Sequence, residues 1–184
     1  QVGNNGDSQT ALVMQESDCH SVWSYAVDKK GSSEDWVIQQ ICEICEDLET
    51  VGLRQDRIII KDDQEPAIID VAKEIAANRD GRFGTALDNS RVGDSDSNGT
   101  IERAVREVEE MMATILAALE ASLRGRVPHE SPVIAWAAES AAVIISYFVE
   151  GSDGKTALKR HRGAKNERPL ACFGERILYL PLDR

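Results

Sequence analysis

Residues 57–66 read Arg57-Ile58-Ile59-Ile60-Lys61-Asp62-Asp63-Gln64-Glu65-Pro66. The apolar run predicts a short strand buried in a covered sheet, and the acids mark the point where this strand ends. Proline is favoured at the first position of a helix, so a helix is expected to begin at Pro66. The stretch therefore predicts a strand–helix unit of an α/β fold, with carboxylates at the carboxyl end of the strand.

Periodicity extends this interpretation in both directions along the chain. Upstream, residues 11–15 and 22–27 are expected to form a hairpin, followed by a helix that begins near Ser32 or Ser33 and runs to about residue 49. Downstream, we expect a short strand at 85–87, a mobile polar loop at 89–98, and helices at 100–123 and 132–149. The second of these helices is apolar nearly all round and is expected to be buried. A basic loop and a strand at 173–180 follow. The predicted class is α/β, a mixed sheet with helices on its faces.

A second acidic segment reads Ser97-Asn98-Gly99-Thr100-Ile101-Glu102-Arg103. Asn98 and Gly99 are expected to form a tight turn, which places Glu102 in the first turn of the helix. Acids at a strand end and at a helix start can converge on one ion, and hard cations such as Mg²⁺ or Mn²⁺ prefer oxygen ligands. Asp63 and Glu102 are the candidate ligands, and Asp62 is expected to be solvated. The alternative is that Asp63 only caps a helix and that Glu102 is only a favourable early acid.

The amino-acid composition limits the class of protein to which the chain can belong. The chain has 184 residues, 42% of them hydrophobic and 29% charged, as in a globular domain. We expect no membrane span and no signal peptide. The net charge is −11, which argues against binding nucleic acid by bulk electrostatics. Residues 151–184 hold eight Lys and Arg against four Asp and Glu, a surplus of four positive charges, so residues 1–150 carry −15.

The two acidic segments resemble motifs of a known family. Residues 63–68 resemble the Asp-Gln-x-Pro signature at the second catalytic carboxylate of retrotransposon integrases, and residues 93–104 resemble the Asn-Gly-x-x-Glu-Arg motif that bears their third. Residues 153–157, 160–163 and 173–176 are similar to segments that follow this core in retroelement polyproteins. The resemblance covers most of the chain from residue 11 onward and implies a ribonuclease H-like integrase catalytic core of the Asp-Asp-Glu superfamily.

The resemblance also implies a chemistry and partners. Such cores hold two Mg²⁺ or Mn²⁺ ions roughly 3.5–4 Å apart and catalyse 3′-end processing and DNA strand transfer by in-line displacement at phosphorus. By position, Asp63 is the second carboxylate and Glu102 the third. The expected partners are DNA, as element ends and target, and further copies of the chain, with no membrane. The candidate phosphate contacts are basic residues on the third long helix and in the tail: Arg106, Lys155, Lys159, Arg160, Arg162 and Lys165. A solvated tail is the alternative.

The strand that carries the first carboxylate in this family is not found before the hairpin. Asp7 lies in a Gly/Asn-rich stretch, and Asp18 lies in the expected hairpin turn. We expect three parts: an irregular stretch at 1–10, an N-terminally truncated core at 11–150, and a basic linker with the start of a β segment at 151–184. Two functions stay open, an integrase core fragment and a non-catalytic ribonuclease H-like remnant that acts as an interaction module. A flavodoxin-like receiver domain ranks last, because it would require regular β–α alternation.

The remaining residue types are expected to be structural. Cys42 and Cys45 lie three residues apart on one helix face, and no second pair completes a zinc site. The cysteines fit a reducing compartment, nuclear or cytoplasmic, and not secretion. The three histidines form no ligand pattern. The three tryptophans, Trp23, Trp36 and Trp136, stand among apolar neighbours and are expected in the core.

Overall fold

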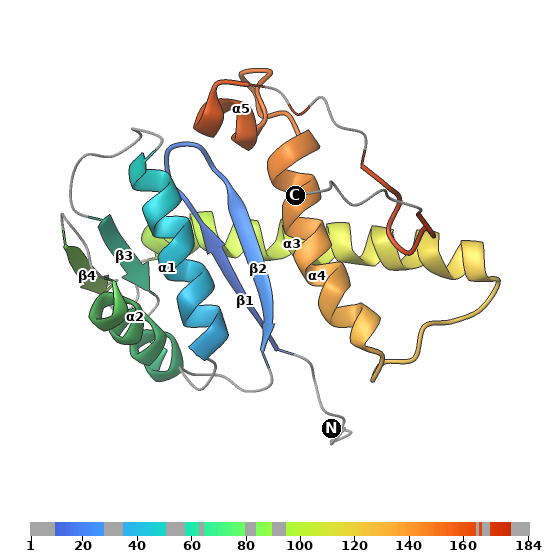
Figure 1. The fold of residues 1–184 in the computed structure, drawn as a ribbon, viewed down its shortest axis with the longest axis horizontal. Coiled ribbons are helices and arrows are strands. Elements are labelled where there is room, and N and C mark those ends of the chain that lie inside the picture. Colours follow the sequence, from blue (N-terminus) through green and yellow to red (C-terminus); the bar gives the residue numbers. More distant parts are fainter. Residues whose placement is uncertain are drawn as a thin grey trace, which may run out of the picture.

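A computed structural model of the chain describes residues 10–27, 35–50, 58–62, 65–79, 84–89, 95–164, 166 and 170–177. Within these residues, four strands and five helices follow in the order ββαβαβααα (Figure 1). The elements are β1 (Thr10–Gln15), β2 (Val22–Val27), α1 (Asp35–Thr50), β3 (Ile58–Asp62), α2 (Pro66–Asn78), β4 (Thr85–Asn89), α3 (Ser95–Leu123), α4 (Pro132–Phe148) and α5 (Ala157–Arg162).

The predicted hairpin is confirmed. β1 and β2 pair antiparallel, with Gln15 opposite Val22. One side chain organises the turn between them, because the Glu16 carboxylate accepts hydrogen bonds from the backbone N–H groups of Asp18 (2.8 Å) and Cys19 (2.5 Å). His20 follows with φ 61°, a left-handed conformation that is uncommon outside glycine and that turns the chain back into β2.

β3 and β4 form a second, parallel pair in which Asp62 lies opposite Asn89. Parallel neighbours need a crossover connection, and α2 supplies it. Val71 and Ile75 of α2 pack with Ile58 and Ile60 of β3. The predicted strand–helix unit is therefore confirmed, and its partner strand is the one expected near residue 85.

Helices cover the hairpin on both faces. Because neighbouring residues of a strand point to opposite faces, Leu12 and Met14 pack with α1 and α2, while Val13 packs with α3 and α4. The cluster with Leu12 also takes in Ile58 and Ile60, so α1 and α2 lie over one face of both strand pairs. Figure 1 shows α3 crossing behind the hairpin and α4 lying beside β2.

A serine joins α4 to the outer edge of the hairpin. The Ser146 hydroxyl accepts a hydrogen bond from the Val22 backbone N–H (2.8 Å) and donates one to the Val22 carbonyl oxygen (3.0 Å). The edge of β2 would otherwise leave these two buried groups without a partner. This contact fixes α4 against the strand at one register.

The structure corrects four expectations about the elements. α3 begins at Ser95, so Asn98 and Gly99 lie inside the helix and Glu102 lies in its second turn. α4 is not buried all round, since Val143 and Phe148 are each 42% exposed. The basic segment contains the helix α5. The N-cap of this helix is Thr156, whose side chain accepts a hydrogen bond from the Lys159 N–H. Residues 173–177, the described part of the last predicted strand, form a turn and irregular chain.

The predicted class, α/β with helices on the sheet faces, is confirmed, although the described strands form two separate pairs where one mixed sheet was expected. Among the described residues, no helix has the length and hydropathy that a membrane span needs.

Candidate functional site

The first acidic segment lies where β3 ends and α2 begins. Asp62 is the last residue of β3 and is buried, with 5% of its surface exposed, which corrects the expectation that it is solvated. Asp63, the predicted second carboxylate, lies outside the described residues. Glu65 is the N-cap of α2 and acts through its backbone, because its carbonyl oxygen accepts hydrogen bonds from the N–H groups of Ile68 and Ile69.

The predicted third carboxylate lies on α3. Ala104 and Val108 of this helix are buried at 1% and 3%, whereas Glu102 and Arg106 are exposed. Glu102 and Arg106 are one turn apart and therefore lie on the same side of the helix. This side faces away from the core, so both side chains are available to a ligand or to DNA.

The chain path limits how far the two acidic segments lie from each other. Asn89 pairs with Asp62, and Ser95 begins α3 six residues later. Six residues span at most about 20 Å when fully extended, so the start of α3 lies within that reach of the end of β4, the strand paired with β3. The described residues include no group of three or more His, Cys, Asp or Glu side chains placed to hold a metal. The metal-binding roles of Asp63 and Glu102 stay predictions.

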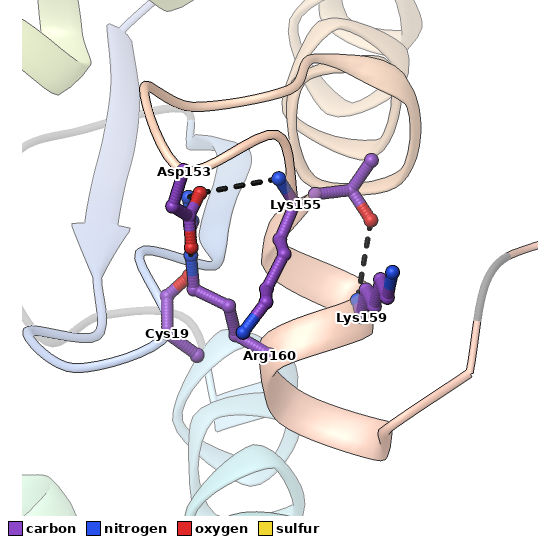
Figure 2. A network of polar contacts seen from close by, with 6 residues as sticks. Cys19, Asp153, Lys155, Lys159 and Arg160 are labelled. Carbon is purple, nitrogen blue, oxygen red and sulfur yellow. Dashed lines mark hydrogen bonds and ion pairs between the residues drawn. The ribbon is translucent and has the colours of Figure 1, made fainter.

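The basic tail is held to the hairpin turn by Arg160 (Figure 2). Its Nη2 lies 2.5 Å from Asp153 Oδ1, its Nε donates to Asp153 Oδ2 (3.1 Å), and its Nη1 donates to the carbonyl oxygen of Cys19 (3.2 Å). The guanidinium hydrogen bonds hold the pKa of Asp153 well below its usual range, and the carboxylate raises the pKa of Arg160. Gly151 lies so close to this guanidinium that a Cβ there would overlap it.

α5 also pairs with α1. The Arg162 guanidinium Nη2 lies 2.9 Å from Asp47 Oδ2, and the Nε2 atom of the buried His161 lies 3.7 Å from the same oxygen. The sequence patterns assigned no role to Asp47, Asp153 or His161. No local signal was available for Asp47, which is 115 residues from Arg162.

These contacts divide the predicted phosphate-binding residues into two kinds. Arg160 and Arg162 bind acids of their own chain. Lys155 is exposed and Lys159 half-buried, and each donates a hydrogen bond through its backbone N–H, to the side chains of Asp153 and Thr156. Arg106 is exposed on α3, and Lys165 lies outside the described residues. Phosphate binding by these six residues stays a prediction.

The cysteines are free thiols among the described residues. Cys45 is buried in the cluster beneath α1, in the structural role expected for it. Cys19 is 1% exposed, and burial raises the pKa of its thiol to about 11. A thiol with this pKa is almost entirely protonated at neutral pH and is a poor nucleophile.

Two tryptophans correct the expectation that all three belong to the core. Trp36 on α1 is 46% exposed and Trp136 on α4 is 64% exposed. Apolar periodicity placed both residues on helices correctly, but it did not distinguish the buried stripe from the opposite face.

Comparison with known proteins finds similarity to solved structures at low sequence identity. No family model matches the chain, and no curated protein does. Among solved structures, the chain is similar to the catalytic core domain of BIV integrase, with 15% identity over 82% of this chain and 84% of that chain and a TM-score of 0.48. It is also similar to a chain of the simian T-cell lymphotropic virus intasome, determined in complex with PP2A regulatory subunit B56 gamma.

The intasome similarity has 12% identity over 94% of this chain and a TM-score of 0.49, and this chain spans about half (52%) of the intasome chain. The first of these structures is thus an integrase catalytic core domain and the second is an intasome.

Proposed function

We propose that the chain is the catalytic core of a retroelement-type integrase, acting on DNA by metal-dependent phosphoryl transfer. The observation that carries the proposal is the position of its two acidic motifs. Asp63 directly follows the last residue of β3, and Glu102 projects from the exposed side of α3, which begins six residues after the parallel partner of β3. The motif resemblance assigns these residues as the second and third metal ligands.

The donor chemistry of the two residues fits a hard divalent cation. Carboxylate oxygens are preferred ligands of Mg²⁺ and Mn²⁺. A bound metal pair would supply the positive charge that stabilises the attacking and leaving oxygens in phosphoryl transfer. In this proposal, the chain would hold the Asp63 carboxylate next to a strand end and the Glu102 carboxylate on a helix.

A third carboxylate is needed for the full ligand set, and the strand pairs indicate where it would enter. β1 and β3 each have one strand partner among the described strands, and side chains of both lie in the cluster beneath α1 and α2. A strand hydrogen-bonded to both would join the two pairs into one mixed sheet. We propose that the first carboxylate belongs to such a strand.

Metal binding by the 184-residue chain is the direct test of the two assigned ligands. Mn²⁺ titration followed by electron paramagnetic resonance should show weak binding that Asp63→Asn and Glu102→Gln each reduce at least about tenfold, since each substitution removes one charged ligand. Glu107→Gln, on the same helix and also exposed, is the matched control and should bind as the wild type does. Equal Mn²⁺ affinity in all four proteins would remove the proposed site.

The same variants test the chemistry. In the presence of Mn²⁺, joining of a labelled DNA 3′-hydroxyl end to a target duplex should be abolished by Glu102→Gln and retained by Glu107→Gln. If the wild type binds Mn²⁺ but joins no DNA ends under any condition, that result favours the second candidate function, a non-catalytic module with this fold. The ion pairs of Arg160 with Asp153 and Arg162 with Asp47 favour that candidate, because they commit two tail cations to the fold.

Phosphate contact is proposed for Lys155, Lys159 and Arg106, because all three lie on the described surface and none of them belongs to the two ion pairs described for the tail, Arg160–Asp153 and Arg162–Asp47. Removing one phosphate-binding cation should lower the slope of log K against log salt by about 1. Lys155→Ala and Lys159→Ala are therefore expected to weaken binding of a short DNA duplex and to flatten its salt dependence. Lys73→Ala, in an exposed pair with Asp70 on α2 (3.6 Å), is the control. Unchanged slopes would exclude the tail as a DNA-binding segment.

A further inference from the structure

A groove lies between α4 and the segment 170–177. Its volume is about 240 Å³, and side chains of both elements line it. The larger of these side chains are the apolar Val143, Ile144, Leu170 and Phe173 and the polar Glu139 and Ser140. The two polar residues are neighbours on α4, so the groove is apolar except at one place, where a carboxylate and a hydroxyl lie together.

A tight turn holds the segment 170–177 in place as the second wall of the groove. The Cys172 N–H donates a hydrogen bond to the Glu175 carboxylate (3.0 Å), and the Glu175 N–H donates one to the Cys172 carbonyl oxygen (2.9 Å). Gly174 lies within this turn at φ 77°, so close to Leu119 of α3 that a Cβ would overlap it. Figure 1 shows the segment in red beside the C-terminal half of α3. Phe173 packs against the core cluster that α3 and α4 share, so the groove is formed before any ligand enters.

The carboxylate in this groove has no cationic partner among the residues that the structure describes. Glu139 is half-buried, and no hydrogen bond or ion pair to its carboxylate is found within that part of the chain. Burial raises its pKa, as expected for a charge that is partly removed from water. A carboxylate in this condition gains more from an approaching cation than a fully hydrated one does, because part of its hydration is already lost.

We propose that this groove binds one lysine side chain, presented by an apolar segment of a partner protein. Pockets for drug-sized ligands measure about 300–1,000 Å³, and this smaller groove suits a single side chain. Its apolar walls suit the methylene stem of lysine, while Glu139 and Ser140 can accept hydrogen bonds from the ammonium group. Val143 and Leu170, on opposite walls, are 42% and 51% exposed and offer contact to apolar neighbours of the lysine. The groove includes neither acidic motif, so the proposal does not depend on the metal chemistry.

The test uses the 184-residue chain with ¹³C-labelled methyl groups and two synthetic pentapeptides, acetyl-Ala-Leu-Lys-Leu-Ala-amide and the same peptide with norleucine in place of lysine. Norleucine has the stem of lysine without the ammonium group, so the pair isolates the charge. The lysine peptide should shift the methyl resonances of Val143, Ile144 and Leu170, which are assigned by single substitutions. It should bind about three- to tenfold more tightly than the norleucine peptide, because an ion pair with a half-buried carboxylate is stronger than a fully exposed one.

Variants separate the groove from general electrostatics. Glu139→Gln should bind the two peptides equally, whereas Glu107→Gln, on the exposed side of α3, should keep the preference for lysine. Leu170→Ser removes part of an apolar wall and should weaken both peptides while leaving their ratio unchanged. The altered side chains are at least partly exposed, and an unchanged melting temperature shows that the fold is retained. Equal binding of the two peptides by the wild type, or loss of the preference in Glu107→Gln, would overturn the proposal.

A second copy of the chain is the alternative occupant of this groove. Sedimentation of the wild type and of Leu170→Ser distinguishes it. If Leu170→Ser dissociates an oligomer while the lysine peptide shifts none of the three methyl resonances, the groove is a self-association interface and the proposal is wrong. If Leu170→Ser leaves the sedimentation unchanged and the lysine peptide shifts these resonances in the wild type, the proposal is supported.

Discussion

The hairpin β1–β2 and the parallel pair β3–β4 are both two-stranded, yet they are buried to different degrees. The hairpin has helices on both faces, since Leu12 packs beneath α1 and α2 while Val13 packs with α3 and α4. Among the described residues, one face of β3 is buried in a core, because Ile58 and Ile60 pack with α2, while Ile59, between them, is 55% exposed. The difference indicates that the hairpin and its helices form the stable body of the fold. β3, the strand that leads into the acidic motif, is held by its contacts with α2.

The largest expected difference in stability is between two variants in which one isoleucine of each region is replaced by alanine. Ile115 of α3 is 7% exposed and belongs to the core cluster of the hairpin body, whereas Ile59 lies on the open face of β3. Ile115→Ala should lower the free energy of unfolding by about 2–5 kcal/mol, because it removes buried apolar surface and leaves a cavity. Ile59→Ala should change it by about 0.5 kcal/mol or less. Urea denaturation of both variants measures the difference.

The result also decides whether the open face of β3 is covered in solution. A loss for Ile59→Ala as large as that for Ile115→Ala would mean that Ile59 is buried by another part of the chain or by another copy. Repeating the titration at a tenfold lower protein concentration separates these two causes, because only a second copy makes the loss depend on concentration.

A smaller effect is expected from the contact that closes the edge of the hairpin. Ser146→Ala leaves the buried N–H and carbonyl oxygen of Val22 without the hydroxyl that pairs with both. An unsatisfied buried polar group costs about 1–3 kcal/mol, so the free energy of unfolding should fall by that amount. Ser140→Ala, on the same helix and half-buried, is the control and should cost about 0.5 kcal/mol or less.

If the two serine variants unfold alike, water replaces the hydroxyl at Val22 and the edge of β2 is accessible. That outcome would mean that the hairpin, like the β3–β4 pair, is only partly protected from water. The difference in burial between the two regions would then be smaller.

The same contrast explains how much could be predicted from the sequence. The hairpin, β3 and α2 were predicted because alternation and apolar runs are local signals. The start of α3 was missed, since Gly99 and the Ser/Asp residues before it have low intrinsic helix propensity and their helical state depends on the rest of the helix.

Long-range contacts had no such signal. The periodicity of α1 and α4 did not show that Trp36 and Trp136 lie on open faces, because that depends on which elements pack against each helix. The tail cations Arg160 and Arg162 were recognised as charges, but their acid partners were not. Asp47 and the Cys19 carbonyl are 115 and 141 residues away from the arginines that they bind. The acidic motifs are recognisable from the sequence alone. That their side chains lie close together is a prediction, which the Mn²⁺ titration tests.

The smallest expected effect concerns the junction of the tail with the hairpin turn. The pKa of Asp153 lies well below its usual range because Arg160 donates hydrogen bonds to it. A carboxyl group whose pKa is lower in the folded than in the unfolded state stabilises the fold above its unfolded pKa, near about 4, and loses that contribution as the pH falls further. Asp153→Asn should therefore lower the melting temperature at pH 7, and its difference from the wild type should narrow progressively below about pH 4.

Circular dichroism melts from about pH 7 to about pH 2.5 measure this difference, with Asp70→Asn as a control, since Asp70 forms an exposed pair with Lys73 within α2 (3.6 Å). An exposed pair of that kind contributes little, so the control should melt as the wild type does throughout. A gap for Asp153→Asn that stays constant with pH would show that Asp153 acts through neutral hydrogen bonds alone. A gap that narrows shows that charge attaches the tail to the hairpin turn, and the tail then belongs to the stable body and not to the less covered β3–β4 region.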